Sequence, residues 1–485
     1  MTISSGLSSA LSGLTVASKA VEVISNNIAN ATTAGYGRRE LITTARALGS
    51  IGQGVQIVGV RREADLALQN DRHSAEAGRD ASGTLAKALK RIETAIGTPD
   101  TPTSLQGRVA ALDAALIEAA SRPDSEARLR AVLDAAGSLA AHVAAAGETV
   151  QDLRTSADGA IASSVAGVND ALRRIADLNG QIRSTLGGQR DASALMDQRQ
   201  QLIDGISGVI PLRAVDRDNG QIALFTATGA PLIDGPPAVL GFAPAAMVTA
   251  DMSLAGGTLS GLTLNGKPVA TGGDNSPIAG GSLAAQFALR DSVAPEAQRR
   301  LDAVARDLIA RFADPGTDAT LPPGAPGLFT DEGQAFDPLS ETGLAQRLAV
   351  NAAADPARGG ALWRLRDGLG AGSPGLGGET GLLLAMQAAL ADPRPTASGG
   401  FMAADRSFAA LASDLASGVA ADRVSAEAEQ SFAAARSSAL AQEEAAQGVD
   451  TDQELQALLM MEEAYAANAR VIQTIGGMID RLLEM

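Results

Sequence analysis

Apolar residues recur at steps of three and four near both ends of the chain, which is the spacing of one face of a long helix. This heptad pattern runs unbroken from Ile3 to Ile28 and again from Leu458 to Leu482. We therefore expect a helix at each terminus, about 45 Å long at 1.5 Å per residue, and we expect the two to pair as a coiled coil. The positions on the two predicted faces are Ile3, Leu7, Ala10, Leu14, Ala17, Val21, Ile24 and Ile28, and Leu458, Met461, Tyr465, Asn468, Ile472, Ile475, Ile479 and Leu482.

The remaining faces of the first helix are also weakly polar. Between residues 2 and 37 the only charged side chains are Lys19 and Glu22, whereas an ordinary surface helix carries a charged outer face. This pattern favours a helix that meets other chains on several sides. An ordinary, weakly polar N-terminal helix remains the alternative at this point.

Two details of the second helix add to the prediction. Asn468 occupies an apolar-face position, where asparagine lowers stability and typically fixes the register of a helix pair. Thr451 is followed three residues later by Glu454, which predicts a capping box at the start of the helix.

Between the ends, the pattern predicts long helices packed as a bundle. Apolar stripes of helical period cover 85–96 and 105–116, a nearly continuous run covers 124–186, and a later stretch covers 405–447. Such long runs are typical of a rod-like body.

The pattern changes after Pro211. Leu212–Asp216 and Gln221–Thr226 flank Asp218-Asn219-Gly220, which predicts a β-hairpin, and Thr258–Leu264 before Asn265-Gly266 predicts another. The predicted fold is therefore mainly α with an inserted β-rich domain, and its domains are discontinuous and nested. Residues 1–34 and 449–485 form a terminal helical assembly domain, 35–210 and 282–448 a long-helix body with irregular loops, and 211–281 an inserted outer domain.

Composition narrows the function. The 485 residues carry a formal net charge of −16, which disfavours binding to nucleic acid or to an anionic membrane. Aromatic residues make up 2% of the chain, which argues against a pocket lined by aromatic anchors. We also expect no membrane span, because no long stretch is uninterruptedly apolar.

Candidate chemistry is sparse. The chain has no cysteine and two histidines, which excludes thiolate zinc sites and disfavours a histidine metal cluster or a serine triad. His73 and His142 fall in helical stretches and are interpreted as solvated or helix-face residues. Asp191, Asp197 and Arg199 are interpreted as charges on a helix face. We expect no catalytic, cofactor-binding or metal-binding residues and a protein that is not an enzyme.

The residues that close the first helix are distinctive. Ser25-Asn26-Asn27-Ile28-Ala29-Asn30-Ala31-Thr32-Thr33-Ala34-Gly35-Tyr36 resembles the N-terminal signature of the flagellar rod, hook and hook-associated protein family. Asparagine and glycine end helices because asparagine competes for backbone hydrogen bonds and both tolerate left-handed conformations. Asn26, Asn27, Asn30, Gly35 and Tyr36 therefore join the two apolar faces as candidate assembly residues.

Further stretches are similar to the hook-associated branch of this family. They are Gly35-Tyr36-Gly37-Arg38, Gly52–Arg62, Leu178–Ile182, Asp191–Leu202, Gly280–Leu283 and Gly327–Phe329, whereas 230–275 and 313–345 match poorly. The resemblance implies a structural subunit of the bacterial flagellum that joins the hook to the filament by helical self-assembly. It also implies an extracellular location at that junction, reached by type III export without a cleaved signal peptide.

The implied partners are the hook protein, a second hook–filament junction protein and further copies of the chain in a ring or helical assembly. A cytoplasmic export chaperone would cover the C-terminal helix before export.

Three alternatives remain. A hook or distal-rod subunit of the same family would differ after Tyr36. A flagellar subunit with an inserted zinc protease would need a His-Glu-x-x-His motif. A cytoplasmic coiled-coil adaptor would carry charges flanking the apolar face, which the first helix lacks.

Overall fold

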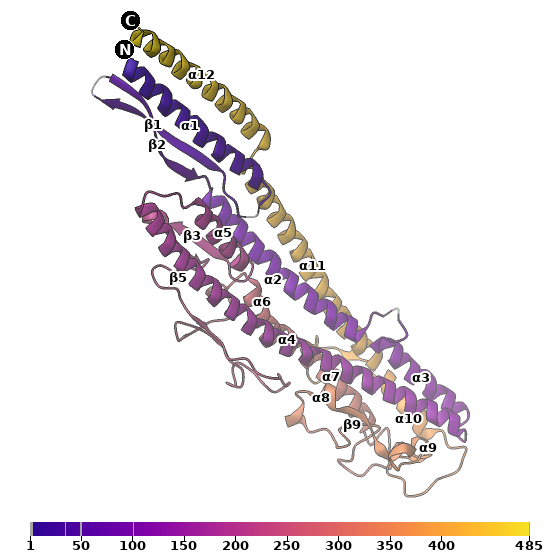
Figure 1. Ribbon diagram of the computed structural model, residues 1–485. Helices are drawn as coiled ribbons and strands as arrows, with labels where there is room; N and C mark the ends of the chain where they lie inside the picture. The colour runs from indigo at the N-terminus through magenta and orange to yellow at the C-terminus, as the bar shows by residue number, and fades with distance from the viewer. Residues whose placement is uncertain (1–2, 34, 49–50, 100, 485) are drawn as a thin grey trace.

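The computed structural model describes residues 3–33, 35–48, 51–99 and 101–484. The chain forms an elongated and mainly helical molecule with small sheets, and both termini lie at the same end (Figure 1). The predicted mainly α fold is confirmed. The helices are α1 (Ile3–Asn30), α2 (Leu66–Ile96), α3 (Leu105–Ser121), α4 (Glu126–Gly187), α5 (Ser193–Ser207), α6 (Ser282–Ala288), α7 (Ala294–Phe312), α8 (Leu344–Arg347), α9 (Arg364–Asp367), α10 (Gly381–Ala391), α11 (Phe408–Ala446) and α12 (Thr451–Leu483).

The strands form small antiparallel sheets. β1 pairs with β2, β9 with β10, and β11 with β12, while β3-β4-β5 and β6-β7-β8 are three-stranded. Their bounds are β1 (Arg39–Leu48), β2 (Ile51–Arg62), β3 (Leu212–Asp216), β4 (Ile222–Thr226), β5 (Pro231–Ile233), β6 (Leu240–Gly241), β7 (Leu262–Leu264), β8 (Lys267–Val269), β9 (Phe329–Asp331), β10 (Leu348–Val350), β11 (Arg394–Pro395) and β12 (Asp405–Arg406).

The chain leaves the terminal end along α2 and returns along α11. These two helices lie side by side over most of the length of α2, and α1 lies beside α12 in the same way (Figure 1). The observed bounds of α2, α3, α4 and α11 confirm the predicted helical stretches. The predicted run at 124–186 is the single 62-residue helix α4.

The apolar stripe of α4 runs along two hydrophobic cores. Val132, Leu139 and Val143 belong to the core of the half far from the termini, which α3, α7, α10 and α11 complete. Ile161 and Leu172 belong to a second core, which α5, α6 and the three-stranded sheets cover. One helix thus carries both cores because its buried positions recur with helical period along its whole length.

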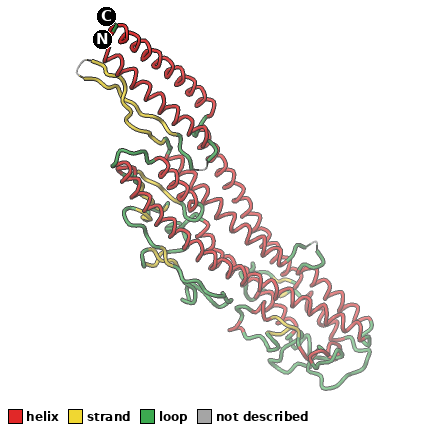
Figure 2. Tube along the Cα trace, viewed as in Figure 1, coloured by secondary structure: helices red, strands yellow, loops and turns green. Residues whose placement is uncertain are grey.

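Both predicted hairpins of the inserted region are present. β3 and β4 pair with Leu212 opposite Thr226, and Asn219 in the turn has φ 57°. The second hairpin is shorter than predicted, because β7 begins at Leu262 and not at 258. The glycine-rich residues before it form turns, and the loops of this region lie along one side of α4 (Figure 2).

Asparagine side chains attach strands to helices at four places in the described chain. In each, the side-chain amide donates to the backbone carbonyl of a strand residue and accepts from the N–H of that same residue, at 2.7–3.2 Å, as a neighbouring strand would. The pairs are Asn27 with Arg39 of β1, Asn70 with Ala214 of β3, Asn169 with Leu240 of β6 and Asn179 with Ile222 of β4.

A buried ion pair fixes the loop that follows β6. Arg290 Nη1 donates to Asp158 Oδ1 at 2.6 Å, and both side chains are almost fully buried. The other Asp158 oxygen accepts from Ala245 N at 2.7 Å. Arg154, on the preceding turn of α4, donates to the carbonyl oxygens of Thr249 and Met252. The two arginines thus satisfy carbonyls that an irregular segment would otherwise bury unpaired.

By length and composition, two helices have the character of a membrane span, contrary to the prediction that none would. These are α1 and α4, which are rich in alanine and valine. The apolar stripe of α4 is used in the two cores, and α1 packs against both α12 and β2. Packing within the molecule buries 44% of the apolar window of α4 but 22% of that of α1, so it accounts for the apolar character of α4 better than for that of α1.

We predict that Asn179→Ala destabilises the chain by about 2–4 kcal/mol, because it leaves both backbone groups of Ile222 and one donor of Arg199 unpaired in a buried site. The urea midpoint of unfolding measures this loss. Asn275→Ala, at an exposed turn position, is the matched control and should leave the midpoint unchanged. An equal midpoint for the two variants would show that the asparagine pairing contributes nothing.

Candidate assembly interface

Helix α1 packs between the β1–β2 hairpin and helix α12 (Figure 1). On the hairpin side, Ser12 Oγ accepts from Val55 N at 3.1 Å, and Gly54, at φ +98°, leaves room for the helix backbone at Ser9. On the other side, Gly6 faces Ile475 and Gly13 faces Asn468. The two terminal helices therefore run antiparallel, and the hairpin belongs with them rather than with the long-helix body.

The predicted α1 positions divide into buried and half-buried residues. Ala10, Ala17 and Ile24 are buried, and they are joined by Ala20 and Val23, which the predicted face did not include. Leu7, Leu14, Val21 and Ile28 are half-buried, and Ile3 is exposed. Of the motif residues, Asn27 is buried, while Asn26, Asn30, Gly35 and Tyr36 are half-buried.

Helix α12 is covered along one face only. The predicted positions Leu458, Met461, Asn468, Ile472 and Ile475 are half-buried, while Tyr465, Ile479 and Leu482 are exposed. Among its described residues, only Glu454 is buried.

A second apolar stripe on α12 lies beside the face that meets α1 and is left exposed. It consists of Met460, Val471 and Met478, which project from nearly the same side of the helix and are 63%, 45% and 52% exposed. Leu455, Leu459 and Leu483 are also more than a third exposed. Soluble chains rarely expose so long a line of large apolar side chains unless a partner covers it.

A buried polar network joins the terminal helices to the hairpin. Asn27 Nδ2 donates to Glu454 Oε2 at 3.1 Å in addition to its pairing with Arg39, and Asn27 Oδ1 accepts from the Tyr36 hydroxyl at 2.9 Å. Arg38 Nε donates to the other Glu454 oxygen at 2.7 Å. Burial raises the pKa of Tyr36 above its usual value, so the hydroxyl keeps the proton that it donates. All four groups of Asn27 and Glu454 thus have partners, although both side chains are almost fully buried.

Glu454 corrects the predicted capping box. Asp450, not Thr451, caps α12, because its carboxylate accepts from the backbone N–H groups of Asp452 and Gln453. The Glu454 side chain is therefore free to turn toward α1.

A second network joins the hairpin to the body through Asp197 of α5. One Asp197 oxygen accepts from Gly37 N at 3.1 Å and from Arg62 Nε at 2.8 Å, and the other accepts from Arg39 Nη2 at 2.9 Å. The Asp197 side chain is 11% exposed. Its interpretation as a helix-face charge was therefore wrong, because the hairpin covers that face of α5.

The interpretation of Arg199 as a helix-face charge was also wrong, because α4 and the turn between β3 and β4 cover it. Arg199 is buried and donates to Asn179 Oδ1 and to Gly220 O, both at 2.7 Å. Burial, with the nearby Arg62 charge, lowers the pKa of Arg199 to about 10. Asp191 is exposed but accepts from the Ser193 N–H and hydroxyl at the start of α5.

A third network holds α2, α5 and α11 together below the hairpin. Arg72 pairs with Glu76 and Asp204 at 2.6 Å each and with Glu444 of α11. Burial alone would lower the pKa of Arg72, but the three carboxylates outweigh it and raise the pKa. An open cavity of about 960 Å³ lies beside this cluster, between the body and the turn at 31–37.

The two histidines are helical, as predicted, and His73 is buried while His142 is half-buried on its helix face. His73 is 1% exposed and lies 2.7 Å from Asp204 Oδ1 through Nε2. His142 Nε2 is 2.9 Å from Ile96 O, and burial lowers the pKa of His142. The prediction of a solvated or helix-face residue was therefore wrong for His73, which lies in the interior of the helical body, and holds for His142.

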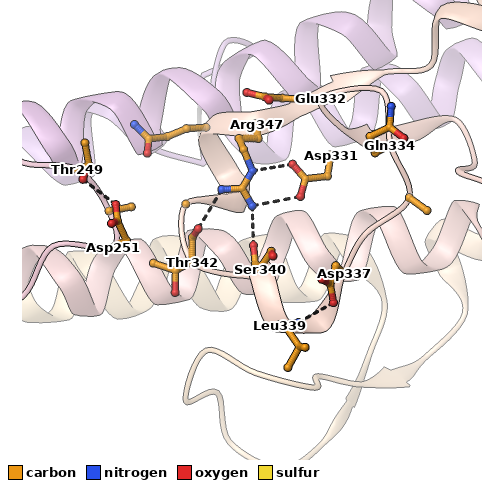
Figure 3. Close-up of a pocket in the computed structure, with 14 residues that line it drawn as sticks. Thr249, Asp251, Asp331, Glu332, Gln334, Asp337, Leu339, Ser340, Thr342 and Arg347 are labelled. Carbon is orange, nitrogen blue, oxygen red and sulfur yellow. Dashed lines mark hydrogen bonds and ion pairs between the residues drawn. The ribbon is translucent and has the colours of Figure 1, made fainter. Parts of the chain in front are cut away.

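The body also carries an open cavity of about 910 Å³ between the loop at 249–251 and the segment 331–347 (Figure 3). Arg347 Nε and Nη2 donate to the two Asp331 oxygens at 2.7 and 3.1 Å, and Nη1 donates to Thr342 O at 3.0 Å. These groups satisfy one another, so the arginine holds the segment folded rather than pointing an unpaired charge into the cavity.

Sequence reasoning missed Asn27, Glu454 and Asp197 as a connected set. Their bonds join distant parts of the chain: 427 positions separate Asn27 from Glu454, and 160 separate Gly37 from Asp197. The available signal was local: Asn27 in the helix-ending motif, and an acidic residue in the first turn of α12, each next to a predicted boundary.

Two sequence families match the chain. The flagellar hook-associated protein FlgK helical domain matches residues 89–320, and the flagella basal body rod protein matches residues 7–36. The flagellar hook-associated protein 1 of Salmonella typhimurium is 31% identical over 243 residues, which are 49% of this chain and 44% of that protein. The flagellar hook-associated protein 1 of Escherichia coli is 29% identical over 245 residues, with the same two shares.

A more distant relative of the same name, from Bacillus subtilis, is 25% identical over 236 residues and 46% of each chain. The chain thus spans less than half of the length of these curated relatives. The solved flagellar hook junction protein FlgK of Burkholderia pseudomallei is 19% identical and covers 54% of this chain and 46% of its own, at a TM-score of 0.44. At that level the structural likeness carries no weight.

A helical rod with paired ends and an exposed apolar helix face is typical of structural subunits of extended assemblies. The matches agree with this class, because the domains they name are flagellar structural domains at the N-terminal helix and in the helical body. Over these residues the chain is similar to flagellar hook-associated proteins, in agreement with the predicted resemblance.

We predict that Asp197→Asn destabilises the attachment of the hairpin by about 3 kcal/mol, because Arg39 and Arg62 lose the charge that compensates them in a largely buried site. Thermal unfolding followed by circular dichroism measures the total loss. Asp170→Asn is the matched control, because Asp170 pairs with two arginines at 56% exposure and should cost less than about 0.5 kcal/mol. Equal losses in both variants would contradict a connecting role for Asp197.

Proposed function

We propose that the chain is a structural subunit that joins the hook of the bacterial flagellum to the filament, and that its terminal helices are the assembly device. The observation that carries this proposal is the second apolar stripe of α12, which the chain's own fold leaves uncovered. Similarity to flagellar hook-associated proteins over 89–320 supports the flagellar context, since those proteins are structural parts of the external flagellum.

In this proposal, the α1–α12 pairs of neighbouring copies pack against one another and line a tube. Burying each large side chain of the exposed stripe would contribute roughly 1.5–3 kcal/mol. The free chain instead keeps Met460, Val471 and Met478 in water. Assembly of many copies therefore gains the free energy of burying these side chains, which the single chain cannot gain. Once packed on both sides, the helix pairs would supercoil as a coiled coil.

The proposed domains follow the same arrangement. Residues 1–34 and 449–485 form the terminal domain, although positions 1, 2, 34 and 485 lie outside the described residues. Residues 35–210 and 282–448 form the body, except that the hairpin at 39–62 packs on α1. Residues 211–281 form an outer domain on the face of α4 where the loops gather (Figure 2).

The proposed partners are the hook protein, a second junction protein and other copies of the chain. Export by the type III pathway without a cleaved signal peptide would place the subunit outside the cell, and a cytoplasmic chaperone would first cover α12. The exposed apolar face supports this last step, because it would otherwise promote association of free chains. In this proposal the subunit is not an enzyme.

We predict that Met478→Asp abolishes joining to purified hook ends and leaves the free chain folded, because the side chain is 52% exposed on α12 but would be buried between copies. Electron microscopy of hook ends measures the joining, and circular dichroism measures the fold. Val471→Asp, on the same stripe, is the second test.

Leu376→Asp is the matched control, because Leu376 is 76% exposed in a loop of the body. It should join hooks as the unaltered chain does. The proposed function is contradicted if both α12 variants join hook ends normally, or if the unaltered chain does not bind hooks.

A further inference from the structure

A line of small residues on α1 faces α12. Gly6, Gly13, Ala20 and Asn27 are one heptad apart. A β-carbon added at Gly13 would lie 2.7 Å from Asn468 Oδ1 and 2.9 Å from its Cγ, whereas one at Gly6 would lie 3.4 Å from Ile475 Cδ1. Gly13 thus forms a notch that the Asn468 side chain fills, and any larger residue at 13 would overlap it.

Asn468 is held in a compact shape that suits this notch. Its Nδ2 donates to Ala464 O, on the preceding turn of α12, at 2.9 Å. The amide is therefore folded back along its own helix, and its oxygen side lies against the α1 backbone at Gly13. A polar side chain is accommodated here without a hydrogen bond to α1, by shape alone.

A second contact lies two heptads further along. Asn27 Nδ2 donates to Glu454 Oε2 at 3.1 Å, and the step from Gly13 to Asn27 on α1 equals the step from Asn468 back to Glu454 on α12. The steps from Gly6 to Gly13 and from Ile475 to Asn468 are also equal. All three contacts therefore belong to one antiparallel register.

Neighbouring registers lose both contacts. A shift by one heptad in one direction places Ile475 at the Gly13 notch and Met461 beside Asn27, so a branched side chain meets the notch and the Asn27 amide loses an acceptor. A shift in the other direction places Met461 at the notch and Glu454 beside Ala20, which offers its carboxylate no donor.

We propose that the Gly13–Asn468 notch and the Asn27–Glu454 hydrogen bond together lock the chain's own C-terminal helix to α1 in a single register. The lock fixes the position of α12 along α1, and with it the height at which the stripe Met460, Val471 and Met478 is presented to the neighbouring copy. The role of that stripe rests on the proposed function, but the lock itself is a property of the free chain.

The register can be measured directly because the chain has no cysteine. Gly6→Cys with Ile475→Cys places two thiols at the observed contact, and Gly6→Cys with Leu482→Cys places them one heptad out of register. Cross-linking with a short thiol reagent, in the full free chain under dilute conditions, compares the two pairs. We expect the first pair to cross-link several-fold faster than the second.

The lock is then broken and restored. Gly13→Ala should reduce this preference several-fold and lower the hydrogen-exchange protection of α12, although helix propensity alone would change protection in the opposite direction. Adding Asn468→Ala should restore both values, because the shorter side chain leaves room for the new methyl group. Gly477→Ala, at a glycine with open space around it, is the matched control and should lower neither.

The proposal is overturned if Gly13→Ala alone keeps the cross-linking preference, or if the effects of Gly13→Ala and Asn468→Ala simply add. Glu454→Gln gives an independent check, and it should lower α12 protection without changing the fold of the body. Each readout uses the free chain, so a failure of the lock is separate from a failure to join hook ends, which would instead contradict the proposed function.

Discussion

The pairing of asparagine side chains with strand backbone is the interaction on which the arrangement of this molecule depends. The sheets are too small to hold themselves in place, since most have two strands. Each asparagine supplies the donor and acceptor that a missing neighbouring strand would provide, and it does so from a rigid helix. Asn169 and Asn179 attach the inserted sheets to α4 through these hydrogen bonds, and Asn27 attaches the hairpin to α1 in the same way. The helices therefore determine where every one of these strands lies.

Asn27 makes the same kind of contact where α1, α12 and the β1–β2 hairpin meet. The same amide that pairs with Arg39 also donates to Glu454, so the hairpin and α12 are fixed by one buried side chain. From there, Asp197 connects the hairpin to α5, and Arg72 connects α5 to α2 and α11. Polar contacts at the base of the α1–α12 pair therefore set its orientation. Further along the pair, small residues of α1 such as Gly6 and Gly13 contact α12. An apolar stripe of α12 stays uncovered.

The sequence predicted the parts with strong periodicity. The terminal helices, the 62-residue helix α4 and the hairpin around Asn219 follow from apolar spacing and turn residues, which are local signals. The spacing did not predict which α1 face meets α12, because leucine and alanine positions repeat on more than one stripe; Ala20 and Val23 are buried although the predicted face omitted them.

The polar connections could not be predicted from spacing at all. Asp197 looks like a surface charge until the hairpin covers it, and Arg199 does until α4 and the turn after β3 enclose it. Glu454 looks like a capping residue, but Asp450 caps the helix instead. His73 is buried because α2 is packed on several sides, which a single helical stripe does not reveal. Long-range contacts between charged residues produce no periodic pattern in the sequence, so only the folded structure shows them.

The central claim is that assembly covers the terminal helices. Hydrogen exchange of the full chain, free and bound to hook ends, tests it most directly. The account predicts that amides of α12 and the facing side of α1 gain strong protection on hook ends, while α4 and α7 stay as they are in the free chain. Protection gained at residues 211–281 with α12 unchanged would contradict it, and would assign the contact to the inserted domain.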